Sequence, residues 1–239
     1  MHIFDIYGII MLGDTMDDKL LEILNNNSNL DDSQKIKINN YLQAVKLFYG
    51  KYGVEYNFEN ISDILRTLKI VEGTDKEEIS YNNEQNVIIL GKSPKNVEFN
   101  SVKCLLEFCS QKYDKETGKY NSGILIKKDD KEYGKEVNKC LTNFLTTMAT
   151  DLCREEDEEL TIEEMLKDRR PDVLHMIQEF VSAEKLVEYY SNADGQGLFN
   201  ELSKNIDPNQ LFSLYKLLDD IEEAKRLQEI EDREETIKM

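Results

Sequence analysis

The stretch KEVNKCLTNFLTTMATDLC, residues 135 to 153, decides the fold of this chain. Its apolar residues recur at helical spacing, among them Leu141, Leu145 and Met148, and neither glycine nor proline interrupts it. Such a pattern predicts one long helix, apolar enough to lie at the centre of the core.

Shorter periodic segments lie on both sides of this central stretch. They predict further helices at 16–24, 31–50, 60–69, 97–112, 171–181, 183–191, 196–204 and 208–235. The period changes to two at 78–81 and 86–90, which predicts a strand pair, while 113–134 is predicted to be a long loop with one strand at 123–126. The predicted fold class is therefore α+β, predominantly α-helical, with a small strand pair or sheet before the helix at 97–112.

The charge of the chain restricts its partners. It has 48 acidic and 30 basic residues among 239, and its formal net charge is −18. A surface of this charge repels phosphate backbones and anionic lipids, so we expect no binding to nucleic acid or membranes. The apolar run at 3–12 is short and contains Asp5, so it predicts neither a signal peptide nor a membrane span. We expect a cytoplasmic protein whose cysteines are reduced thiols, namely Cys104, Cys109, Cys140 and Cys153.

Two segments, 102–110 and 137–145, match the layout of a zinc site. In that layout one helix carries H-E-x-x-H, in which the two histidines bind zinc one turn apart and the glutamate is the general base. A second helix supplies a third ligand, a glutamate, from an N-E-x-x-[ST] context. Here the corresponding segments are VKCLLEFCS and VNKCLTNFL.

These segments resemble the gluzincin-like zinc peptidases of bacteria, and the resemblance covers about 79–218. The loop at 112–123, with its Tyr-Asp-Lys, and the segment EYYSNADGQGL at 188–198 are similar to other parts of that family. The resemblance implies a zincin-like helical core. It divides the chain into an N-terminal helical region at 1–75, a degenerate peptidase-like domain at 76–226 and a charged, frayed tail at 227–239.

The chain departs from the family at every functional position. Lys103 and Glu107 replace the two histidines, Cys104 replaces the general base, and Lys139 replaces the third ligand, although the flanking Asn138 and Thr142 are kept. An ammonium group has no lone pair to offer a metal ion. The resemblance therefore implies a catalytically inactive pseudoenzyme, without metal or cofactor, that acts as a protein- or peptide-binding or regulatory module.

The substituted residues predict an ion pair in place of the metal. Lys103 and Glu107 are neighbours at i and i+4, and Lys139 would face them if the two helices pack as in the family. We expect a Lys139–Glu107 pair, and a vestigial cleft beside the strand at 86–90 that could hold a peptide.

Two alternatives stay open. One is a metal-dependent peptidase with unorthodox ligands such as Cys104, Glu107 and His175. The apolar neighbours of His175 favour instead a hydrogen-bonded structural histidine. The other is a structural or oligomerising helical protein that associates through the helix at 208–235.

Overall fold

A predominantly helical α+β fold is formed by the residues that the computed structural model describes, as the sequence predicts. These residues are 18–55, 58–73, 79–91, 97–114, 118–151 and 171–238.

Among the described residues, three helices precede the sheet: α1 (Asp18–Asn26), α2 (Asp32–Lys51) and α3 (Phe58–Thr67). A capping box starts α2, because Asp31 Oδ1 accepts from Gln34 N–H at 2.8 Å and Gln34 Oε1 accepts from Asp31 N–H at 3.0 Å. The helices predicted in this region are confirmed within the described residues.

The predicted strand pair is confirmed as part of a three-stranded sheet of order β1-β3-β2. The antiparallel pair consists of β2 (Ser80–Asn82) and β3 (Val87–Leu90), and β1 (Lys69–Glu72) lies parallel to β3 on the other side. The sequence did not predict β1, because its four residues follow the apolar face of α3 without a break. β3 is the central strand, so both of its edges are paired within the sheet.

The segment at 113–134, predicted to be a loop with one strand, instead contains two short hairpins. They pair β4 (Lys112–Asp114) with β5 (Lys119–Asn121), and β6 (Ile126–Lys128) with β7 (Lys131–Tyr133). The prediction was wrong because three-residue strands rich in lysine lack an apolar alternation. The turn between β6 and β7 has an unusual sequence. Asp129 and Asp130 both have positive φ, 50° and 59°, and a two-residue turn of this conformation usually contains Asn-Gly.

The central helix pair consists of α4 (Val97–Cys109) and α5 (Lys135–Asp151). Both are lined with buried side chains that join one core with those of α2 and α3. The α5 helix confirms the long central helix that the sequence predicts from residue 135. Cys104, Cys109 and Cys140 are buried and form no disulfide within the described residues, whereas Cys153 lies outside them.

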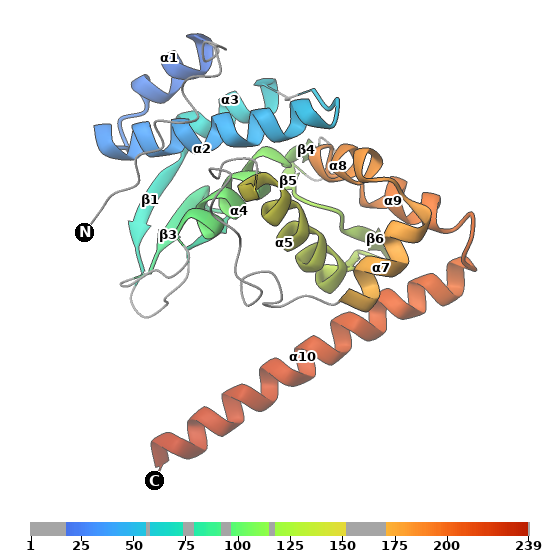
Figure 1. Ribbon diagram of the computed structural model, residues 1–239. Helices are drawn as coiled ribbons and strands as arrows, with labels where there is room; N and C mark the ends of the chain where they lie inside the picture. Colours follow the sequence, from blue (N-terminus) through green and yellow to red (C-terminus); the bar gives the residue numbers. More distant parts are fainter. Residues whose placement is uncertain are drawn as a thin grey trace.

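Four helices complete the described chain. They are α7 (Pro171–Phe180), α8 (Ala183–Ser191), α9 (Gly195–Leu202) and α10 (Pro208–Lys238). Figure 1 shows α1, α2 and α3 on one side of the central helices and α10 crossing beyond α5 on the other. The charged end of α10 is helical to Lys238, and every described side chain from 223 to 231 is exposed. No helix in the described ranges combines the length and the apolar character that crossing a membrane requires.

The carboxylate of Asp219 attaches α10 to the start of α5. Its two oxygens accept from the N–H groups of Gly134 at 2.8 Å and Glu136 at 3.0 Å, at the positive end of the α5 dipole. This carboxylate thus caps a helix distant from it in the sequence.

Replacing this cap is expected to weaken the fold. Asp219→Ala should lower the free energy of unfolding by about 1 to 2 kcal/mol, because two N–H groups at a helix start lose their acceptor. Asp220→Ala is the matched control, since that side chain is exposed, and its effect should stay below about 0.5 kcal/mol. Urea unfolding measures both, and equal effects would contradict the capping role.

Candidate functional site

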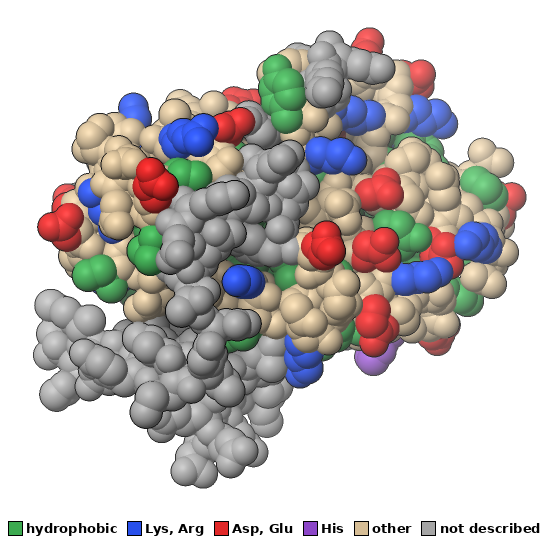
Figure 2. Space-filling view, turned by 90° about the horizontal axis from the view of Figure 1, so that it is seen from above, with side chains coloured by type: hydrophobic (Ala, Val, Ile, Leu, Met, Phe, Trp, Pro, Cys, Tyr) green, Lys and Arg blue, Asp and Glu red, His purple; other side chains and the backbone are tan. Residues whose placement is uncertain are grey.

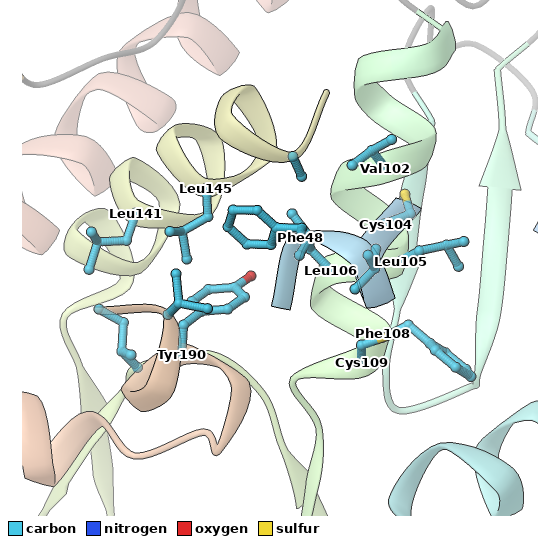
Figure 3. Close-up of a cluster of buried hydrophobic side chains, with 14 of the residues drawn as sticks. Phe48, Val102, Cys104, Leu105, Leu106, Phe108, Cys109, Leu141, Leu145 and Tyr190 are labelled. Carbon is cyan, nitrogen blue, oxygen red and sulfur yellow. The ribbon is translucent and has the colours of Figure 1, made fainter. Parts of the chain in front are cut away.

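The helices that match the peptidase layout pack directly on one another. Figure 3 shows Phe48 of α2 and Tyr190 of α8 between them, with Leu141 and Leu145 of α5 facing this aromatic pair. Phe48 and Tyr190 are fully buried. The space between the helices is therefore occupied by apolar and aromatic side chains.

Cys104, at the position of the general base, is a core residue. It is 1% exposed, and burial raises the pKa of its thiol, which therefore stays protonated. A protonated, buried thiol is a poor nucleophile and a poor metal ligand. Cys104 therefore acts as a small apolar side chain of the core.

Glu107 is the most perturbed acid of the site. Its half-buried side chain is surrounded by protein, and this desolvation raises its pKa to about 7, while the ammonium of Lys103 lowers the pKa only in part. Tyr81 of β2 and Tyr190 of α8 lie close enough for the Glu107 charge to raise their pKa values further. Within the described residues, Glu107 forms no hydrogen bond through its carboxyl group and no ion pair at 4 Å or less.

Lys139, at the position of the third ligand, is directed to α10. Its ammonium lies 3.4 Å from Glu222 and 3.9 Å from Glu136. The expected Lys139–Glu107 pair is wrong, because no such pair is found among the described residues. The reason is that Glu222 of α10 lies next to Lys139 and pairs with it instead. Glu222 is 83 residues from Lys139 in the sequence, so helical spacing could not predict this pair.

The two flanking residues that match the family have structural roles. Asn138 Oδ1 accepts from the N–H of Ile124 at 2.9 Å and holds the segment before β6 against α5. Thr142 lies one turn later and its hydroxyl lies 2.9 Å from that of Tyr190, besides donating to the carbonyl of Asn138 at 2.8 Å. These hydrogen bonds explain the presence of Asn138 and Thr142 without any role in a metal site.

Two tyrosines of the site were missed by the sequence analysis. Burial raises the pKa of Tyr190, so its hydroxyl stays protonated next to Thr142. The hydroxyl of Tyr81 accepts from Gln111 Nε2 at 2.6 Å and donates to Asn86 Oδ1 at 2.9 Å. Their position next to α4 could not be predicted from the sequence, because it depends on how β2 and α8 pack.

The alternative ligands do not come together. His175, which the sequence favoured as a hydrogen-bonded structural histidine, is exposed on α7, whereas Cys104 is buried in α4. Among the described residues, no three side chains of His, Cys, Asp or Glu are grouped so that they could hold a metal ion. The arrangement offers one perturbed carboxyl group, Glu107, beside one ammonium group.

Comparison with known proteins finds no matching family model, no matching curated protein and no matching solved structure. The geometry of the chain itself therefore carries the functional argument.

Proposed function

We propose that the chain is a catalytically inactive relative of the gluzincin-like zinc peptidases that binds a protein or peptide partner. The observation that carries the proposal is the ion pair of Lys139 with Glu222 of α10, which replaces the expected pair with Glu107. A third zinc ligand would have to come from position 139. The helix pair is held together instead by a core of aromatic and aliphatic side chains. Asn138 and Thr142 bind α5 to the segment before β6 and to α8.

The surface charge supports a protein partner rather than a polyanion. The chain has a net charge of −18, and on the face in Figure 2 the Lys and Arg side chains are interspersed with Asp and Glu. A nucleic acid requires a continuous basic surface, which this face does not offer.

A hydrolysis assay tests the inactive part of the proposal. Wild type and Glu107→Ala are incubated with a mixture of quenched fluorescent peptides, once with added zinc and once with a chelator. We expect no hydrolysis above the buffer rate under any condition, because no activated water can form without a set of ligands. Zinc-dependent hydrolysis by the wild type that Glu107→Ala abolishes would favour a peptidase with unorthodox ligands.

A further inference from the structure

The outer strand of the sheet, β1, has hydrogen-bonding groups on both of its sides. Towards β3, the N–H of Lys69 donates to Asn86 O at 3.1 Å and the N–H of Gly73 donates to Leu90 O at 2.6 Å. Residues alternate in direction along a strand, so 69, 71 and 73 bond to β3. Ile70 and Glu72 therefore direct their N–H and C=O groups to the opposite side.

No strand of the described residues pairs with that opposite side. Across the described chain, β3 is the only strand paired with β1, and Figure 1 shows β1 as the outer strand. The side chains of Lys69, Val71 and Glu72 are exposed, Val71 to 42%. The other edge strand, β2, is half-buried along its length and packs against α4. An extended segment can therefore approach the sheet at β1 and add a strand.

A second copy of the chain fits this edge poorly. In an antiparallel pair, residues that bond must lie opposite one another, so Ile70 and Glu72 of one copy would have to face Ile70 or Glu72 of the other. None of these registers brings Lys69 opposite Glu72, and one of them brings two Glu72 carboxylates together. Two chains of net charge −18 also repel one another. A separate peptide has neither constraint.

We propose that β1 binds an extended segment of another protein, which runs antiparallel to it with the order basic, β-branched, apolar, acidic. The basic residue would lie opposite Glu72, the β-branched residue opposite Val71 and the acidic residue opposite Lys69. Opposite charges and β-branched pairs across strands are favourable, and Ile70 and Glu72 supply up to four main-chain hydrogen bonds. This inference rests on the proposed function and names its binding surface and class of partner.

Fluorescence anisotropy with two labelled peptides tests the proposal. One has the core Lys-Val-Val-Glu and the other the reversed core Glu-Val-Val-Lys, and both are titrated with the full chain at low salt. We expect the first to bind about tenfold more tightly, since in an antiparallel strand only it places opposite charges across from Glu72 and Lys69. Equal binding of the two peptides would overturn the proposed order.

A matched pair of variants separates main-chain from side-chain contacts. Glu72→Pro removes the outward N–H and leaves the bonds to β3 intact, so the chain should fold with an unchanged unfolding midpoint. Glu72→Ala removes the same side chain but keeps the N–H. We expect Glu72→Pro to bind the Lys-Val-Val-Glu peptide about threefold to tenfold more weakly than Glu72→Ala does.

Hydrogen exchange supplies a readout that does not depend on the variants. The amides of Ile70 and Glu72 should exchange more slowly in the wild type saturated with the peptide, whereas that of Val71, already bonded to β3, should change little. Equal affinities of the two variants, or unchanged exchange at Ile70 and Glu72, would overturn the proposal while the hydrolysis assay stays negative. Zinc-dependent hydrolysis would instead contradict the proposed function.

Discussion

Glu107→Gln is expected to stabilise the protein at pH 8 by about 2 to 3 kcal/mol and to have little effect at pH 4. In the folded state the pKa of Glu107 is raised to about 7 from the ordinary value of 4.5, because burial disfavours the carboxylate. Between these two values the folded chain binds more protons than the unfolded chain. Stability therefore falls as the pH rises from about 4.5 to 7, and glutamine, which cannot ionise, removes this loss.

Urea unfolding of wild type and variant across this pH range measures the effect. Glu22→Gln on α1 is the control, because Glu22 is exposed, and its effect should stay within about 0.5 kcal/mol at every pH. Lys103→Met should lower the stability at pH 8, since the nearest ammonium to Glu107 is lost. A Glu107→Gln effect that does not vary with pH would contradict a desolvated carboxyl group at this position.

Gly195→Ala is expected to destabilise the chain by about 3 kcal/mol or more, through overpacking against main chain. A Cβ at Gly195, the first residue of α9, would lie 2.2 Å from Leu125 O and 2.5 Å from Ile124 C. Neither backbone atom can swing aside as a side chain could, because Asn138 holds the N–H of Ile124 from α5.

Gly50→Ala is the matched control for this substitution. Gly50 lies near the end of α2, and a Cβ there would meet no atom within 4 Å. Alanine should stabilise the chain by about 0.5 to 1 kcal/mol, because it restricts the unfolded state and favours helix. Thermal unfolding of the two variants should therefore give shifts of opposite sign, and two small shifts of the same sign would contradict the close contact at α9.

The helices could be predicted from the sequence because their signals are local. Caps such as Asp31 and apolar spacing such as that of α5 lie within a few residues of the structure they determine. The edge strand β1 and the two hairpins could not be predicted, since they consist of three or four residues stabilised by partners elsewhere. The φ values of Asp129 and Asp130 are likewise imposed by the pairing of β6 with β7 rather than by a typical turn sequence.

In the candidate site, too, local features could be predicted and tertiary contacts could not. Helical spacing places Lys103 and Glu107 one turn apart on α4, and Asn138 and Thr142 one turn apart on α5. The partner of Lys139 could not be predicted, because Glu222 reaches it from α10 through tertiary packing. The desolvation of Glu107 and the position of Tyr190 also depend on how α8 and β2 cover α4, which no short motif encodes.

Metal retention shows whether the α4 and α5 pair is a structural junction or a zinc site. The purified chain is loaded with zinc, dialysed, assayed for bound metal and unfolded by heat in zinc and in chelator. We expect no stoichiometric zinc and the same unfolding midpoint in both buffers. Stoichiometric zinc that Glu107→Ala loses, together with a lower wild-type midpoint in chelator, would contradict it.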